Sequence, residues 1–420
     1  MRSVARGVVL SIFGTASSFV VSAQQAPPCQ LELVSVGGIG RQIAVMGGVH
    51  SFAAGGVFAR CVGQPTTMRA DSVAWYSERD RMDFTNAVEF RDSTMRLNAD
   101  RATYYASDER LEAFGNVRLV NRETGSVLSG PRLTYYRDAP AVRDSAEIFA
   151  VGRPHVEYRS TTDSTMQPYV IVADRVRLRG ETAWAGGQVT IDRDDLAARG
   201  DSAELHTGAG TGLLLGDAEA VGQDSSDYRL VGKRIDFLLE RDELRWLRSQ
   251  DEASASSSDW QIAGDTVEFD VARDRVQGGR AWGTMLRPRA VSDQHTIEAD
   301  SLELDAPEQV LTEVRAFGQA LAASGGDTLT GETDWLAGDS LTARFEDAES
   351  GGRVLREMRA VGNGRAFYHI YPEGREGVAA INYVRGRIIT VRFTDDALDR
   401  VDVVDAADGI YLEPPRKPKP

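Results

Sequence analysis

The sequence is 420 residues long and strongly acidic, with 63 Asp and Glu against 48 Lys and Arg and a formal net charge of −15. A net charge of this sign and size argues against nucleic acids and anionic membrane surfaces as partners. Hydrophobic residues make up 42% of the chain, which is enough for a sizeable core. After residue 30 no apolar run approaches the roughly 18 residues of a membrane-spanning helix.

The first residues predict export. Arg2 and Arg6 precede an apolar run over residues 7–21, and Val21-Ser22-Ala23 follows as a small-x-small cleavage site. A basic start, a short apolar stretch and such a site are typical of a secretory signal peptide. We therefore expect residues 1–23 to be cleaved from an exported protein, with an N-terminal membrane anchor as the alternative.

The chain has two cysteines, Cys29 and Cys61, both early in the predicted mature protein. An even cysteine count in an oxidising compartment predicts one disulfide. Two free thiols are the alternative. We expect residues 24–66 to form N-terminal strands that this disulfide would tie together.

One short phrase recurs along the rest of the chain: a small residue, Asp, any residue, an apolar residue, any residue, and an apolar or aromatic residue. Copies with the Asp begin at Ala70, Ala99, Ala173, Gly200, Gly264, Ala299 and Gly338, and degenerate copies begin at Gly130, Gly232 and Gly386. The ten copies have a mean period of about 35 residues, which is typical of stacked repeat architectures.

Each copy predicts a half-buried strand, because polar and apolar residues alternate with a period of two. In one copy Asp300, Leu302 and Leu304 share a face, whereas Ser301 and Glu303 lie on the other. We expect the Asp to accept backbone hydrogen bonds at a turn, at the head of the strand. A second strand follows each copy, and the glycine in its middle predicts a bulge or a bend.

Two strands per repeat, stacked about ten times, predict an elongated all-β body with two sheet walls. If each repeat adds one strand to each wall, the body is roughly 45–50 Å long. Small residues such as Ala113 and Ala316 recur among the apolar positions of the second strands. The interior can therefore have room for an apolar ligand, and a fully packed interior is the alternative. The tail, residues 413–420, is rich in Pro and Lys and is expected to be disordered.

Two segments carry a resemblance to a known family. Residues 99–105 (ADRATYY), followed by residues 111–117 (LEAFGNV), resemble the LptA/OstA-like family of lipopolysaccharide-transport proteins, and so do residues 381–393. The resemblance covers residues 67–412 and implies a twisted, elongated β-jellyroll, also called a β-taco. Two consecutive units, about 67–225 and 226–412, are one division that its length allows.

The resemblance also implies a function. It points to a periplasmic protein, with an association with the outer membrane as a further option, that shields acyl chains of lipopolysaccharide or a related glycolipid in an apolar groove. It implies end-to-end strand pairing with other β-jellyroll transport proteins, and an outer-membrane barrel as a further partner. The groove would be lined by the phase-matched apolar positions Val73, Trp75, Ala102, Tyr104, Val176, Leu178, Val267, Phe269, Leu302 and Leu304.

The sequence offers little for catalysis. Its five histidines are scattered without metal-ligand spacing, and no zinc-protease, nucleophile-elbow or P-loop motif is present. We therefore expect no catalytic residues, no metal site and no cofactor. Two alternatives remain open: a β-solenoid enzyme acting on polysaccharides, for which residues 192–195 (DRDD) are the best acidic cluster, and a structural envelope scaffold that transports nothing.

Overall fold

A computed structural model describes residues 29–138, 143–159, 167–223, 228–241, 243–257, 260–273, 275–292, 294–324, 333–347, 353–371, 379–394 and 397–413. The predicted signal peptide and residues 414–420 of the predicted tail lie outside this range. No helix in the described part of the chain is long and apolar enough to cross a membrane.

The expected all-β architecture is confirmed. Over the described residues the chain forms one 28-stranded antiparallel ladder with three short 3-10 helices. The strands are β1 (Leu31–Val36), β2 (Gly40–Val45), β3 (Gly48–Cys61), β4 (Thr67–Tyr76), β5 (Arg81–Arg91), β6 (Met95–Tyr105), β7 (Arg110–Asn121), β8 (Val127–Tyr136), β9 (Glu147–Val151), β10 (His155–Tyr158), β11 (Tyr169–Val172), β12 (Arg175–Arg179), β13 (Thr182–Arg193), β14 (Leu196–His206), β15 (Thr211–Gly222), β16 (Arg229–Glu240), β17 (Glu243–Ser256), β18 (Gln261–Ala272), β19 (Arg275–Trp282), β20 (Arg289–Val291), β21 (His295–Glu298), β22 (Ser301–Asp305), β23 (Glu313–Ser324), β24 (Trp335–Asp347), β25 (Arg353–Ile370), β26 (Ala380–Thr394), β27 (Ala397–Val404) and β28 (Asp408–Leu412). The 3-10 helices are η1 (Ser77–Arg79), η2 (Ala106–Asp108) and η3 (Pro307–Gln309).

Most strands belong to two walls, because each one bends near its middle. Residues 81–85 of β5 pair with residues 101–105 of β6, and after a shift in register residues 88–91 pair with residues 96–99. We call the sheet that contains residues 101–105 wall 1, and the sheet that contains residues 95–98 wall 2. The line of register shifts between them is the corner.

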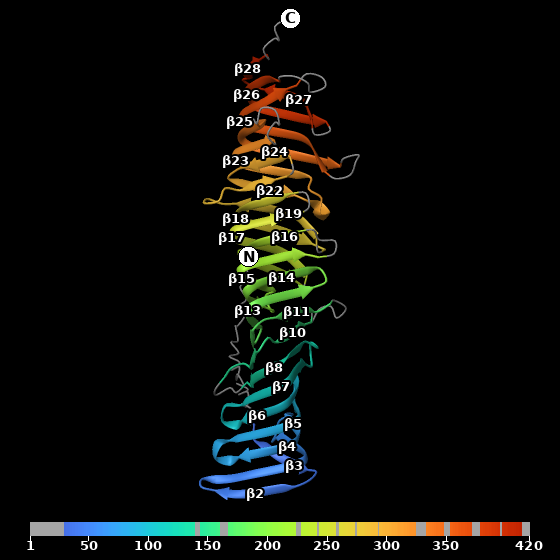
Figure 1. The fold of residues 1–420 in the computed structure, drawn as a ribbon, viewed down its shortest axis with the longest axis vertical. Helices are drawn as coiled ribbons and strands as arrows, with labels where there is room; N and C mark the ends of the chain where they lie inside the picture. Colours follow the sequence, from blue (N-terminus) through green and yellow to red (C-terminus); the bar gives the residue numbers. More distant parts are fainter. Residues whose placement is uncertain are drawn as a thin grey trace, which may run out of the picture.

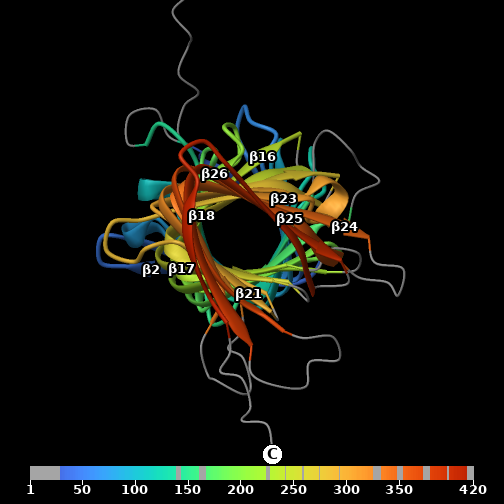
Figure 2. The same ribbon diagram turned by 90° about the horizontal axis from the view of Figure 1, so that it is seen from above.

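The ladder is longer than the repeat count predicts. Because each bent strand contributes to both walls, a two-strand repeat adds two layers to each wall, and the expectation of one strand per wall was wrong. About 22 layers at about 4.8 Å give a body on the order of 100 Å long, and the predicted 45–50 Å was about half of that. Figure 1 shows this elongated stack, and Figure 2 looks along it.

The recurrent Asp lies at the corner. In most copies it is in the middle of a long strand, as Asp100 is in β6, whereas Asp174 and Asp300 directly precede the short strands β12 and β22. Asp265 accepts hydrogen bonds from three backbone N–H groups, those of residues 284–286, as expected. In β7, Gly115 and Asn116 both have positive φ, 73° and 46°, and they add one residue opposite Asp100 of β6. Asn116 Nδ2 donates a hydrogen bond of 2.9 Å to Asp100 Oδ2. A Cβ atom on Gly115 would lie 2.3 Å from the same carboxylate oxygen. Glycine is therefore required there by both the backbone conformation and the space.

The same arrangement recurs along the corner. Four further pairs place an Asp carboxylate against a glycine of positive φ in the next long strand: Asp174 and Gly187, Asp201 and Gly216, Asp300 and Gly318, and Asp339 and Gly362. The corner also reverses the inward-facing parity. In β6, Leu97 and Ala99 are buried before it and Ala102 and Tyr104 after it, while Asp100 is exposed. The phrase therefore encodes a bend.

Twice along the ladder the layers are broken at the corner into separate short strands. Strand β8 pairs with both β9 and β10, these pair with β12 and β11, and both of these pair with β13. The pairings thus close a ring of six strands. Strands β18 to β23 close a second ring in the same way.

The interior between the walls is filled by two clusters of buried side chains. One extends from Cys29 to Val189 and the other from Tyr169 to Val391. Both pack against the partly buried Ile191 and Ala203, so they meet around β11 to β14. The division into units at residues 225 and 226 remains a prediction.

Candidate functional site

An elongated cavity of about 460 Å³ lies where the two clusters meet. Its lining runs from Met95 of β6 to Leu247 of β17 and is mostly apolar. Wall 1 contributes Val176, Leu178, Ala183, Ala185, Ala203, Leu214 and Ile235, and wall 2 contributes Leu119, Leu128, Val156, Ile171, Ile191, Leu196 and Ala198. Small residues gather in β13 and β14, and this is why side chains do not fill the space between the walls here.

Packed side chains close the interior on both sides of this cavity. Beyond the lining towards the N-terminus, Met68 of β4 and Phe90 of β5 are fully buried, and beyond it towards the C-terminus Ile262 and Val267 of β18 are fully buried as well. An apolar interior packed in this way leaves few voids larger than a water molecule. The hollow is therefore confined to the middle of the ladder.

The free edges of the walls, opposite the corner, also meet on both sides of the cavity. We call these edges, formed by the turns between strands, the lips. Towards the N-terminus, Tyr135 of wall 1 donates a hydrogen bond of 3.0 Å to Asp92 of wall 2. Towards the C-terminus, Phe269 of wall 1 makes edge contacts with Trp260 and Tyr228 of wall 2, at centroid distances of 5.9 and 6.4 Å.

At the cavity itself, turn residues of both lips form part of the lining. Asn121, Thr124 and Ser126 contribute from wall 2, and residues 180–182 and 207–208 contribute from wall 1. The cavity therefore extends from the core to the lips. The charged residues among the described lining are Glu181 and Glu204, and Glu204 is paired with His206 at 3.0 Å on the outer face.

A disulfide ties the N-terminal layers together. Cys29 and Cys61 are bonded, with 5.1 Å between their Cα atoms, and both side chains are buried. Cys61 ends β3, and Cys29 precedes β1, which pairs with the end of β3. The bond therefore fastens the first strand of the ladder to its neighbour in wall 2.

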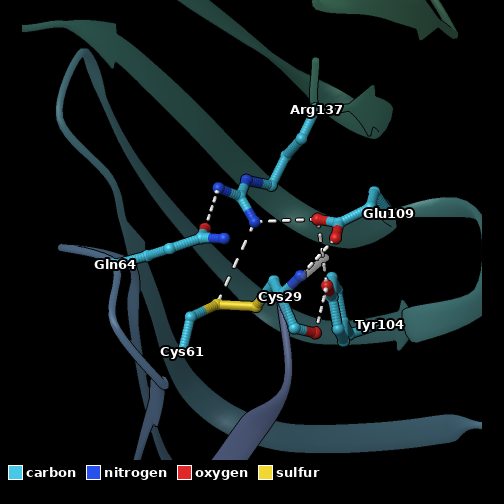
Figure 3. The surroundings of a disulfide bond; sticks show 6 residues. All are labelled: Cys29, Cys61, Gln64, Tyr104, Glu109 and Arg137. Atoms are coloured by element: carbon cyan, nitrogen blue, oxygen red, sulfur yellow. Dashed lines mark hydrogen bonds and ion pairs between the residues drawn. A yellow bond between two sulfur atoms is a disulfide. The ribbon is translucent and has the colours of Figure 1, made fainter. Parts of the chain in front are cut away.

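Beside the disulfide, a buried carboxylate joins the two walls (Figure 3). Glu109 of wall 1 pairs with Arg137 at 2.8 Å, and their side chains are only 7% and 12% exposed. Glu109 accepts hydrogen bonds from the Cys29 backbone N–H and from the Tyr104 hydroxyl, while Arg137 donates to Gln64 of wall 2 at 2.7 Å. Burial and the nearby Glu109 carboxylate raise the pKa of the Tyr104 hydroxyl above its usual value.

A second hollow lies at the N-terminal end of the ladder. It measures about 440 Å³ and is lined mainly by residues of β1 to β5, among them Leu31, Leu33, Phe52, Met82 and Phe84. Hydrophobic side chains of its lining remain exposed: Leu33 is 42% exposed and Val36 is 36% exposed. This end of the interior is open.

The predicted groove residues fall into three groups. Val176 and Leu178 line the central cavity, and Val73 and Trp75 line the N-terminal hollow. The other six lie in the packed core, at 5% exposure or less: Ala102, Tyr104, Val267, Phe269, Leu302 and Leu304. Further lining residues occupy phrase positions that were not among these ten: Ala203 and Leu205 in the copy that begins at Gly200, and Ile235 and Phe237 in the copy that begins at Gly232. Ala183 and Ala185 lie on the second strand β13, where the small size of the side chains was the signal.

Among the described residues, no three His, Cys, Asp or Glu side chains gather as metal ligands. The acidic cluster at residues 192–195 is divided between two environments: Arg193 is buried, stacks on Tyr169 at 4.4 Å and binds Asp195, whereas Asp192 and Asp194 are exposed.

No curated protein matches the chain. A family model described as OstA-like protein matches residues 67–145, the segment that contains β4 to β8 and therefore the first corners with a recurrent Asp and a left-handed glycine. The resemblance read from ADRATYY and LEAFGNV lies within this match. Residues 67–145 of this chain form an OstA-like domain.

Proposed function

We propose that the protein is a periplasmic, non-enzymatic lipid-binding and transport protein of the twisted β-jellyroll type, which shields acyl chains of lipopolysaccharide or a related glycolipid between its two walls. The observation that carries this proposal is the apolar central cavity, which extends to the lips. Its volume of about 460 Å³ lies within the roughly 300–1,000 Å³ of small-molecule sites. The OstA-like match over residues 67–145, which include the lining residues from Met95 to Leu128, supports a role in the cell envelope.

The chemistry of the lining favours a hydrocarbon ligand. A water chain in the cavity would find few polar partners, whereas an acyl chain would bury its methylene groups against Leu, Ile and Val side chains at about 0.8 kcal/mol each. A polar head group would stay near the lips, where Thr124, Ser126 and Glu181 lie. The disulfide suits an oxidising compartment such as the periplasm.

The two ends of the ladder support partners that pair edge to edge. In the described chain, β1 and β2 pair only with β3 at one end, and β27 and β28 pair only with β26 at the other. Exposed apolar residues accompany both edges, including Ile43 at one end and Ile410 and Leu412 at the other. Unpaired edges are templates for strand addition. We propose other β-jellyroll transport proteins as the partners, with an outer-membrane barrel as a further one.

Lipid co-purification tests the proposed function. The protein is isolated from its native envelope without detergent exchange, and bound lipids are identified by mass spectrometry. We expect a glycolipid with acyl chains, in reduced amount after Ala203→Phe, which places a ring inside the cavity, and in unchanged amount after Ala197→Phe, on the other face of β14. Repeated absence of lipid from folded protein would refute the proposal, and release of sugars from envelope glycans would favour the enzyme alternative.

A further inference from the structure

We propose that the central cavity is a dead-ended chamber, loaded from the side between the lips and sized for about twenty hydrocarbon carbons. Its ligand class is a lipid with one long chain or two short ones, held as a discrete cargo. This inference rests on the proposed function and specifies the lipid and its route of entry.

The first support is the packing at the ends of the chamber. A chain moving along the ladder axis towards the N-terminus would have to displace Met68, Val88 and Phe90 of β4 and β5, which are at most 1% exposed. Towards the C-terminus it would meet Ile262, Val267 and Phe269 of β18, which are also at most 1% exposed. In a core packed at this density, a side chain cannot move aside without displacing its neighbours. Neither end of the ladder is therefore a route to the cavity.

The second support comes from the lips. The contacts of Tyr135 with Asp92, and of Phe269 with Trp260, join the walls on either side of the cavity. Between these contacts, lip residues of both walls line the hollow, with Ser126 on wall 2 and Thr207 on wall 1 among them. Among the described residues, the lips beside the cavity are therefore the remaining way in, and a head group would stay outside while the chain enters.

The third support is the volume. An engineered apolar cavity of about 150 Å³ accepts one benzene, which has six carbons. The central cavity, at about 460 Å³, is about three times larger and so corresponds to about eighteen to twenty carbons. The lining extends over ten layers, from β6 to β17, or about 40 Å along the axis. This elongated shape suits an extended chain better than a bundle of many chains.

A chain-length series tests the chamber. Binding of lysophosphatidylcholines with about 10 to about 24 carbons is measured below their micelle concentrations, by displacement of a fluorescent fatty acid from the full chain. A closed chamber predicts about fourfold tighter binding per added methylene, up to about eighteen to twenty carbons, and no gain or a loss beyond. An open groove predicts a continued gain up to the longest chain, and that result would overturn the proposal.

Filling the chamber provides the matched control. A phenyl ring at Ala203 occupies about the space of six carbons, so Ala203→Phe should lower the optimal length by about six carbons. Ala197→Phe should leave it unchanged, because Ala197 alternates with the buried Leu196 and Ala198 and faces outward. Both variants are first checked for an unchanged thermal transition. If lysolipids do not bind while the native envelope still yields a multi-chain glycolipid, the chamber is refuted and the proposed function stands.

Discussion

The corner makes a quantitative prediction for Gly115→Ala. An alanine at φ 73° costs about 1–2 kcal/mol because its Cβ crowds the following carbonyl. The new Cβ also lies 2.3 Å from Asp100 Oδ2, so the carboxylate must move and the hydrogen bond from Asn116 is lost, at about 1 kcal/mol. We expect Gly115→Ala to lower the free energy of unfolding by about 2–3 kcal/mol in total.

Gly63→Ala is the control, because it shares the backbone conformation and lacks the contact. Gly63 has φ 72°, and a Cβ there would meet nothing within 4 Å. The free energy lost in Gly115→Ala should exceed that lost in Gly63→Ala by about 1 kcal/mol, and this difference measures the contact with Asp100. Asp100→Ala should cost about 1 kcal/mol in the wild-type background and nothing further in the Gly115→Ala background, since the same hydrogen bond from Asn116 is already lost there.

The measurement has to be local, because a stacked ladder can open in parts. Hydrogen exchange under native conditions gives the local opening free energy, read from the amides of β6 and β7 for Gly115→Ala and from those of β3 and β4 for Gly63→Ala. Urea unfolding gives the free energy of unfolding of the whole protein. Equal costs for Gly115→Ala and Gly63→Ala would refute the reasoning. Strictly additive effects of Gly115→Ala and Asp100→Ala would refute it as well.

Three further predictions concern interactions outside the corner. Replacing Cys29 and Cys61 by serine should destabilise the first layers by about 3–4 kcal/mol through loop-closure entropy, measured as faster exchange of β1 amides; unchanged exchange would contradict this. Glu109→Ala leaves the guanidinium of Arg137 largely buried without its carboxylate partner and should lower the free energy of unfolding by about 3 kcal/mol, measured by urea unfolding. As a control, Glu308→Ala removes an exposed ion pair and should lower it by less than about 1 kcal/mol. Hydrogen bonds from Arg344 and Arg315 lower the pKa of Glu313, so its contribution to stability is present at neutral pH and is lost as the pH falls through that lowered pKa. In the Glu313→Gln variant, the free energy of unfolding should therefore fall less steeply between about pH 5 and about pH 3. An unchanged pH dependence in this range would count against the pairing of Glu313 with the two arginines.

The repeat was predictable from the sequence because alternation survives in every copy, and the phrase copies at residues 70, 99 and 200 all lie in long strands. The bend was not predictable. Asp100 and Ala102 have the same parity in the sequence, which predicts that their side chains point to the same face. Only the extra residue in β7 directs them to opposite faces. Gly115 in mid-strand was a usable signal for it. Asn86 and Ala87 form a left-handed pair without any glycine, so the corner between β5 and its neighbours had no such signal.

The position of the cavity was also beyond a residue-by-residue interpretation. Val176 and Val267 occupy the same place in the phrase, yet one lines the cavity and the other is packed in the core. What differs is the total side-chain volume that neighbouring strands supply to a layer. Strands β13 and β14 supply alanines at positions 183, 185 and 203, and a comparison of inward-facing volumes along the chain would have located the hollow.

The bent strands also determine how the molecule can open. Because most strands are continuous through the corner, the two walls can separate only by rotating about the corner as a hinge. A half-strand of five residues is about 17 Å long, so a rotation of about 10° at the corner moves a lip by about 3 Å. The hydrogen bonds of Arg137 with Gln64 and of the Cys29 N–H with Glu109 join the two walls and restrain that rotation at the N-terminal end, and the contacts of Phe269 with Trp260 and Tyr228 restrain it beyond the cavity.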